Sequence, residues 1–252
     1  MKLIADIGNT MSKLGIFDGS NLVEVKTFKS NDSKKEISRQ ISNLGKFSSI
    51  IYSAVGENKQ NYNKDFPDAF IIELSKDTPL PIILNYATPK TLGVDRIAIA
   101  VGANSLFPNN NVLAIDTGTC ITFDFVGEDE SYLGGAISPG LRMRLSSLHN
   151  ETKMLPFIEA PNPITTIELI GKDTKSSILS GVINGIENEI VGAIKNYSLQ
   201  YNNLIVLFTG GDSTYFKNRS TILLDSKKNK IFADPYLTLK GLNVILDYNE
   251  NR

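Results

Sequence analysis

Two segments of the chain place an aspartate two residues before a glycine, each directly after an apolar run: Asp6-Ile7-Gly8-Asn9-Thr10 and Asp116-Thr117-Gly118-Thr119-Cys120. Glycine in a tight turn lets backbone N–H groups approach a ligand, and such groups hold phosphate oxygens. The aspartate can hold a cation against those phosphates, and Lys13 can neutralise further charge. Two such turns facing each other would form a phosphate clamp for phosphoryl transfer, although either turn alone is also typical of a plain hairpin.

An acid and a base stand side by side in Gly93-Val94-Asp95-Arg96, in the first turns of a predicted helix. Asp95 can accept a proton from a substrate hydroxyl, and Arg96 can bind a carboxylate through two hydrogen bonds. The same residues also fit an acid that the helix dipole favours next to a solvated arginine. The residues alone leave both interpretations open.

Two further segments are rich in glycine. Thr209-Gly210-Gly211-Asp212 follows an apolar strand and precedes a helix, where ligands meet the carboxyl end of a sheet. Gly134–Gly140 is either backbone that lies against a ligand or a strand that ends in a tight turn. The Gly-x-x-x-x-Gly-Lys-Ser/Thr pattern of Walker-type nucleotide sites does not occur.

Alternating and continuous apolar patterns predict the secondary structure. We expect strands at 3–7, 13–17, 22–28, 49–55, 70–74, 112–115, 121–126, 132–137 and 204–208, and helices at 33–44, 88–107, 139–149, 174–197 and 235–246. The strand–turn–strand pattern restarts after Asn109-Asn110-Asn111, which suggests a duplication. We therefore predict two domains, residues 1–110 and 111–252.

Composition excludes several classes of function. The chain has 252 residues and a formal net charge of −1, without the basic clusters of a nucleic-acid or membrane surface. One Cys and one His exclude an internal disulfide and every two-His metal motif. No apolar run approaches the roughly 20 residues of a membrane span, and Asp6 interrupts any signal-peptide core. These features predict a soluble cytoplasmic protein with a small-molecule partner, and neither a nucleic acid nor a membrane.

Taken together, the motifs resemble those of type III pantothenate kinases, which belong with sugar kinases, Hsp70 ATPase domains and actin. Asp-x-Gly turns are common to that whole group. Leu92–Arg96 combined with the Gly-Gly-x-Ile-x-Pro-Gly stretch at 134–140 is specific to the family. The resemblance spans the chain and implies an α/β fold of two ribonuclease H-like halves, each a mixed sheet with flanking helices.

The resemblance also implies an activity, the transfer of phosphate from ATP to pantothenate in the first step of coenzyme A synthesis. It implies ATP, Mg2+, a monovalent cation (K+ or NH4+), and a homodimer. Asp95 corresponds to the general base and Asp116 to the cation site. The ATP contacts would be Asp6, Ile7, Gly8, Asn9, Thr10, Met11, Ser12, Lys13 and Thr119, and the pantothenate contacts Tyr86, Gly93, Val94, Asp95, Arg96 and Thr174.

Two other functions compete with this one. A kinase of the same superfamily that acts on a sugar is disfavoured by the Leu92–Arg96 stretch and by the absence of a longer sugar-binding insertion. A catalytically weak nucleotide-binding regulator is disfavoured because the chain retains Asp95 and has no appended basic region. A regulator without catalysis would have no need of that carboxylate.

Overall fold

The computed structural model describes residues 1–8, 10–29, 46–54, 66–162, 164–224 and 230–252. The contacts divide the chain into two compact units. The first consists of residues 1–108, 130–132 and 236–252, and the second of residues 109–129 and 133–235. The C-terminal segment, which the predicted division at 110/111 places in the second half, thus packs within the first unit.

The first unit contains a five-stranded mixed sheet with the order β3-β2-β1-β4-β5. Its strands are β1 (Lys2–Ile7), β2 (Met11–Asp18), β3 (Asn21–Lys29), β4 (Ser49–Ala54) and β5 (Phe70–Glu73). β1, β2 and β3 form an antiparallel meander, and β4 pairs in parallel with β1. One face of this sheet buries an apolar cluster that includes Leu3, Ala5, Leu14 and Ile50.

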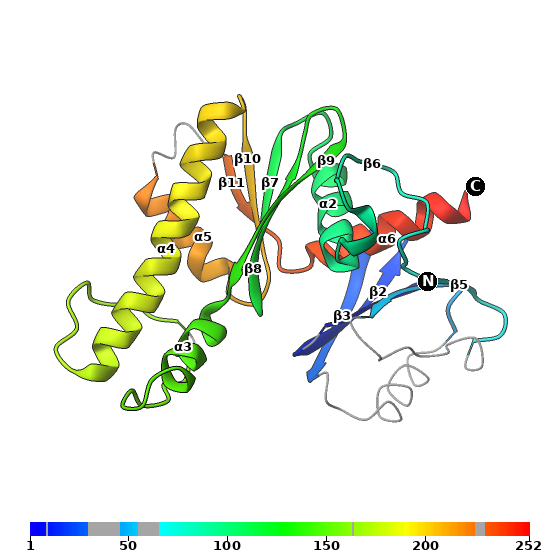
Figure 1. The fold of residues 1–252 in the computed structure, drawn as a ribbon. Helices are drawn as coiled ribbons and strands as arrows, with labels where there is room; N and C mark the ends of the chain where they lie inside the picture. Colours follow the sequence, from blue (N-terminus) through cyan, green and yellow to red (C-terminus); the bar gives the residue numbers. More distant parts are fainter. Residues whose placement is uncertain (9, 30–45, 55–65, 163, 225–229) are drawn as a thin grey trace. The chain divides into compact units, whose positions relative to one another are not determined.

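The second sheet repeats this topology. β7 (Val112–Thr117), β8 (Cys120–Val126) and β9 (Ser131–Pro139) are adjacent in that order, and β10 (Ile205–Thr209) and β11 (Lys230–Ala233) follow on the other side of β7. The short strand β6 (Ile83–Leu84) pairs with the start of β9. Matching strand orders confirm the predicted duplication; Figure 1 shows the two sheets. β6, with two residues, is too short to show a pattern, and β11, which begins in a lysine-rich part of the sequence, was not predicted either.

The helices occupy the predicted segments with two corrections. The expectation holds for α4 (Thr174–Gln200) and α6 (Leu237–Glu250), and α5 (Ser213–Leu223) is the helix expected after Thr209-Gly210-Gly211-Asp212. The predicted helix at 33–44 lies outside the described residues. The helix expected from Thr88 is a 3₁₀ turn, η2 (Pro89–Thr91), and then α2 (Val94–Leu106), because Leu92 and Gly93 are extended. α3 (Leu141–Asn150) begins after Gly140 and not at Pro139, which ends β9.

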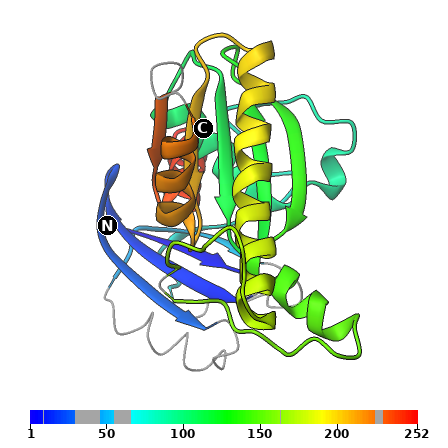
Figure 2. The same cartoon turned by 90° about the vertical axis from the view of Figure 1, so that its left-hand side faces the viewer.

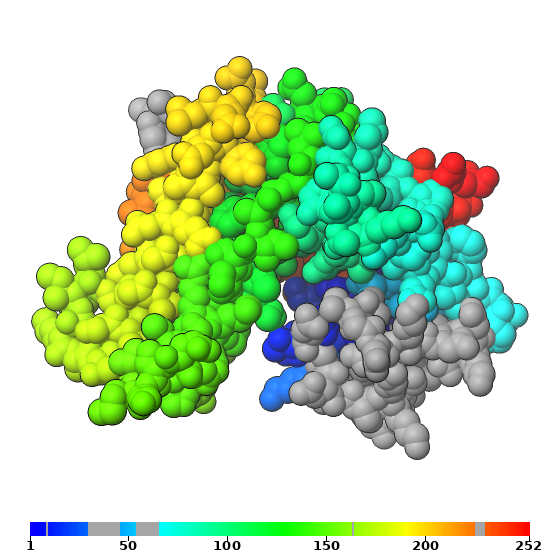
Figure 3. Space-filling view, in the orientation of Figure 1, coloured from blue at the N-terminus to red at the C-terminus, as the bar shows by residue number. Residues whose placement is uncertain are grey.

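α4 covers the second sheet, as Figure 2 shows. Its isoleucine and valine side chains at every fourth position are buried in one cluster with residues of β7, β8 and β10. A buried apolar stripe of this kind is the main source of stability for a long helix. Figure 3 shows that the segment before α4 and the start of that helix, both yellow-green, lie on the surface.

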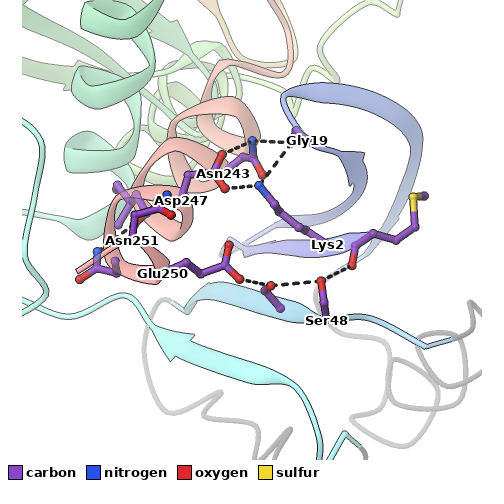
Figure 4. A network of polar contacts seen from close by, with 11 residues as sticks. Lys2, Gly19, Ser48, Asn243, Asp247, Glu250 and Asn251 are labelled. Carbon is purple, nitrogen blue, oxygen red and sulfur yellow. Dashed lines mark hydrogen bonds and ion pairs between the residues drawn. The ribbon is translucent and has the colours of Figure 1, made fainter.

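α6 is fixed to the first sheet by polar contacts (Figure 4). The Lys2 ammonium pairs with the Asp247 carboxylate, and Asn243 Nδ2 donates to the Gly19 carbonyl oxygen at 3.2 Å. The Ser49 hydroxyl donates to Glu250. These contacts tie the end of the chain to β1, to β4 and to the turn between β2 and β3.

The crossing of α2 and α6 depends on two glycines. A methyl group at Gly241 would overlap the backbone carbonyl of Ala98, and one at Gly102 would overlap the Leu237 carbonyl oxygen. The backbones of α2 and α6 therefore lie closer together than they could if either of these two positions carried a side chain. This contact places α6 against the helix whose first turn contains Asp95.

We expect Gly241→Ala to lower the free energy of unfolding by about 1–3 kcal/mol, because the added methyl group overpacks the helix crossing. Gly192→Ala is the matched control, since a methyl group added at Gly192 of α4 would have no neighbouring atom within 4 Å among the described residues. That control should raise stability by about 0.5–1 kcal/mol through helix propensity. Urea denaturation measures both values, and equal effects of the two substitutions would contradict the close crossing.

Candidate active site

The first Asp-x-Gly motif forms the β1–β2 hairpin. Asp6 lies one residue before the end of β1, and Ser12 opens the pairing on β2 opposite Ile7. A side chain at Gly8 would meet the Met11 carbonyl oxygen, so the turn requires glycine there. Asn9 lies outside the described residues. Of the predicted ATP contacts in this segment, Ile7 and Ser12 are buried, Gly8 and Lys13 are partly buried, and Thr10 and Met11 are exposed.

Asp6 lies in the middle of a row of three side chains across the sheet. It pairs with Lys13 on β2 and with Ser53 on β4, and paired residues share a face of the sheet. The Ser53 hydroxyl donates to Asp6 Oδ1 at 3.0 Å. Ser53 was not among the predicted site residues, because its position beside Asp6 follows only from the register of β4.

The Asp6 carboxyl has a pKa above its ordinary value. Burial is the largest cause, and the negative charge of Asp95 raises the pKa further. The Ser53 hydrogen bond and the positive charge of Lys13 act in the opposite direction. The fold thus brings Asp95 close enough for its charge to act on Asp6, although the two residues are far apart in the sequence.

Asp95 lies in the first turn of α2, after the N-cap Gly93. Its Oδ1 accepts a hydrogen bond from the Arg96 backbone N–H at 2.9 Å, and a side chain at Gly93 would collide with the carboxylate. The Arg96 side chain is 6% exposed, so its interpretation as a solvated arginine is wrong. Asp95 itself is partly buried, with Val94 beside it also partly buried.

Tyr86 precedes η2 in the same unit. Its ring centroid lies 5.9 Å from that of Tyr132, which is fully buried. This contact fixes a partly buried aromatic ring on the chain segment that leads to Gly93 and Asp95. The first unit therefore contains the predicted base, most of the predicted nucleotide turn, and all the predicted pantothenate contacts except Thr174.

The second Asp-x-Gly motif forms the β7–β8 hairpin in the second unit. Asp116 pairs with Thr122 on β8 and with Thr209 on β10. Gly210 has a φ of 91°, and a methyl group there would overlap the Asp116 carboxylate. The Asp116 carboxylate therefore lies directly against the backbone of Gly210, with no side chain between them. Thr119, the remaining predicted ATP contact, is exposed on the turn.

The Gly210-Gly211-Asp212 loop is bonded to the end of β7. The Asp212 N–H donates to the Thr117 carbonyl oxygen at 3.2 Å, and the Thr117 hydroxyl donates to the Thr209 carbonyl oxygen at 3.1 Å. Burial raises the pKa of Asp212, while the positive charge of Arg142 lowers it. This loop leads directly into α5, which begins at Ser213.

The glycine-rich segment 134–140 packs against its own unit. A side chain at Gly135 would overlap the Phe123 carbonyl, and one at Gly140 would overlap the Gly118 and Thr119 carbonyl oxygens. The Gly140 N–H also donates to the Thr119 carbonyl oxygen at 3.1 Å. The glycines therefore allow β9 and the start of α3 to lie close to β8 and to the second turn.

Thr174 is the first residue of α4 and is exposed. The preceding Asp173 caps the helix by accepting a hydrogen bond from the Ser176 N–H at 2.8 Å. Thr174 lines a cavity of about 700 Å³ between α3 and α4, together with Arg144, Ser147 and Ser177. A hydroxyl at this place is available to a polar ligand.

Metal-ligating clusters and membrane-spanning helices are both absent from the described residues. Within that part of the chain, no three His, Cys, Asp or Glu side chains gather to hold a metal ion. None of the helices described here has the length and apolar character to cross a bilayer.

The sequence is similar to curated proteins along its whole length. The family model described as type III pantothenate kinase matches residues 2–196. A type III pantothenate kinase of Christiangramia forsetii is 43% identical over 100% of both chains, and one of Bacteroides fragilis is 42% identical over 100% of both.

Solved structures support the fold class at low sequence identity. A Campylobacter jejuni protein described as a Baf family transcriptional activator has a TM-score of 0.59 and 22% identity, covering 99% of this chain and 100% of that one. The polyphosphate/ATP-glucomannokinase of an Arthrobacter strain has a TM-score of 0.51 and 12% identity, covering 99% and 100%. The duplicated mixed sheets are those of the actin, Hsp70 and sugar-kinase group, as predicted. The family model and the Christiangramia forsetii and Bacteroides fragilis relatives agree, and the chain therefore belongs to the type III pantothenate kinase family.

Proposed function

We propose that the protein transfers the γ-phosphoryl group of ATP to the primary hydroxyl of pantothenate, giving 4′-phosphopantothenate and ADP. This is the first step of coenzyme A biosynthesis. One observation supports the proposal above the others. Asp95, placed at the start of α2, lies close enough to Asp6 for its negative charge to raise the pKa of that carboxyl. The proposed proton acceptor thus exerts its charge on the first residue of the turn to which the family resemblance assigns the ATP phosphates.

In the proposed reaction, the Asp95 carboxylate accepts the proton of the substrate hydroxyl as its oxygen attacks the γ-phosphorus. The bond between that phosphorus and the β–γ bridging oxygen breaks, and ADP leaves. Phosphoryl transfer depends mainly on positioning and charge stabilisation, so the position of the Asp95 carboxylate relative to the substrate hydroxyl matters most. The hydrogen bond from the Arg96 N–H to Asp95 Oδ1 restricts the orientation of this carboxylate.

The other predicted residues take binding roles in this proposal. The turn from Asp6 to Lys13 and Thr119 would bind ATP, with the Lys13 ammonium neutralising phosphate charge. Arg96 would pair with the pantothenate carboxylate, which suits a guanidinium. Tyr86, Gly93, Val94 and Thr174 would complete the substrate contacts.

Two cations accompany the nucleotide in this proposal. Mg2+ in nucleotide sites is commonly held by one or two carboxylates together with the phosphates, and Asp6 supplies such a carboxylate. The chemistry of bound Mg2+ is neutralisation of charge on the β- and γ-phosphates. Asp116 would hold the monovalent cation, K+ or NH4+. The bare backbone at Gly210 beside its carboxylate fits an ion that prefers oxygen ligands.

We further propose a homodimer that works in the cytoplasm, where ATP is available, without a nucleic-acid or membrane partner. Support for the dimer comes from apolar side chains on the surface of the second unit. Met154, Phe157, Leu169 and Ile170 are between 57% and 89% exposed. Exposed apolar residues gathered in one segment are typical of interaction surfaces.

The proposed reaction is tested by identifying its product. The purified protein is incubated with Mg-ATP, K+ and pantothenate, and the mixture is analysed by mass spectrometry. We expect a pantothenate derivative that has gained one phosphoryl group on the primary hydroxyl. ATP consumption without this product would contradict the assignment of the acceptor.

A further inference from the structure

Ser53 occupies a place that the proposed reaction does not yet use. It lies near the end of β4, its exposed fraction is 1%, and its hydroxyl contacts Asp6 Oδ1 at 3.0 Å. Because an ionised carboxylate only accepts hydrogen bonds, the Ser53 hydroxyl is the donor. A donor fixed on a central strand restricts the orientation of the carboxylate that it contacts.

Asp6 and Ser53 also lie on the same face of the first sheet, opposite its apolar cluster. The apolar cluster of the first sheet contains Ala5 and Tyr52, so Asp6 and Ser53 point to the opposite face. Asp95 exerts its charge on Asp6, and α6 contacts Ser49 on the same face as Ser53. Ser53 is therefore a buried polar residue whose hydroxyl bonds to a carboxylate of the candidate site.

Asp6 has a polar neighbour on each of the two adjacent strands. Lys13 on β2 and Ser53 on β4 pair with it, and the Ser53 hydroxyl donates to Asp6 Oδ1 at 3.0 Å. A lysine has a long flexible stem, whereas a serine hydroxyl one bond from Cβ holds its acceptor in a narrower range of positions.

The duplicated half has a comparable residue. Thr209 on β10 pairs with Asp116 just as Ser53 on β4 pairs with Asp6, and it is also 1% exposed. β4 and β10 hold the same place in their sheets. A buried hydroxyl residue thus stands beside the aspartate of each Asp-x-Gly motif.

We propose that Ser53 is a positioning residue for nucleotide binding, whose hydroxyl holds the Asp6 carboxylate in the orientation that the bound nucleotide requires. The inference rests on the proposed function only in assigning ATP to the turn that follows Asp6. The inference predicts that loss of the Ser53 hydroxyl weakens the binding of ATP and leaves the binding of pantothenate unchanged.

The test compares Ser53→Ala with Ser49→Ala. Ser49 is a matched control, because it lies on the same strand and face, is equally buried, and bonds to Ser48 and Glu250 instead of Asp6. Calorimetry gives the Kd for Mg-ATP, and steady-state kinetics gives KM for ATP and for pantothenate. Circular dichroism sets a temperature at which all variants are folded.

We expect Ser53→Ala to raise the Kd and the KM for Mg-ATP about tenfold, the usual effect of losing a hydrogen bond to a charged group. The KM for pantothenate should stay within about twofold, and Ser53→Thr, which keeps the hydroxyl, should restore nucleotide affinity. Ser49→Ala should leave nucleotide affinity unchanged. Equal nucleotide affinities of Ser53→Ala and Ser49→Ala would overturn the proposal, as would an equal rise in both KM values.

The binding measurement separates this inference from the proposed function. If pantothenate is not phosphorylated, the function fails, but the Kd for Mg-ATP still compares the two serine variants. If phosphorylation occurs and the two variants bind Mg-ATP equally, only the role of Ser53 fails.

Discussion

Asp95→Asn should lower turnover by about 10²–10⁴-fold, the usual contribution of a positioned general base. An amide cannot accept the proton of the attacking hydroxyl, so the transition state loses its proton acceptor. The amide oxygen still accepts the hydrogen bond that the Arg96 N–H donates to Asp95 Oδ1, so the start of α2 should remain intact. ATP binding should therefore change little.

The measurement combines steady-state kinetics with calorimetric titration of Mg-ATP. Asp68→Asn is the matched control, because Asp68 is an exposed aspartate of the same unit and lies outside the site. It should leave both quantities unchanged. Unchanged turnover of Asp95→Asn would remove Asp95 as the base. A fall in turnover matched by an equal loss of ATP affinity would assign it a binding role instead.

Asp116→Ala should abolish the activation of the enzyme by K+. The substitution removes the carboxylate that lies against the bare backbone at Gly210. Without it, turnover in the presence of K+ should fall to the level that the unchanged protein shows without K+. Rates measured across a K+ series, with ionic strength held constant, give this result directly.

A second variant tests the same cation site without removing the charge. The methyl group of Gly210→Ala would overlap the Asp116 carboxylate, and the φ of 91° at this position disfavours any side chain. Gly211→Ala is the control, because a methyl group there would have no neighbour within 4 Å in the part of the chain that the structure describes. Gly210→Ala should weaken K+ activation and Gly211→Ala should not. K+ activation that persists in Asp116→Ala would place the cation elsewhere.

The local parts of the fold could be predicted from the sequence. The two hairpins that start at Asp6 and Asp116 combine apolar strands with glycine turns, and both formed as expected. The period of four along α4 likewise predicted its buried stripe. Such patterns depend on neighbours in the sequence, and this is why one chain is enough to reveal them.

The non-local parts could not be predicted. Ser53 lies beside Asp6 only because β4 pairs in parallel with β1 in one register, and no local pattern encodes that register. Gly241 resembles an ordinary helix glycine in the sequence, and only the crossing of α6 with α2 gives it a role. The start of α2 was misplaced, because Pro89 is a good first residue for a helix, while Leu92 and Gly93 interrupt it. The apposition of the two Asp-x-Gly turns stays a prediction.

The central claim is that this chain phosphorylates pantothenate, and release of ADP tests it most directly. The protein is supplied with Mg-ATP and K+, and ADP is measured with pantothenate, with glucose and without an acceptor. We predict release that depends on pantothenate and stays at background with glucose. Release that is independent of the acceptor, or absent from a folded sample that binds ATP, would contradict this claim and favour a nucleotide-binding regulator.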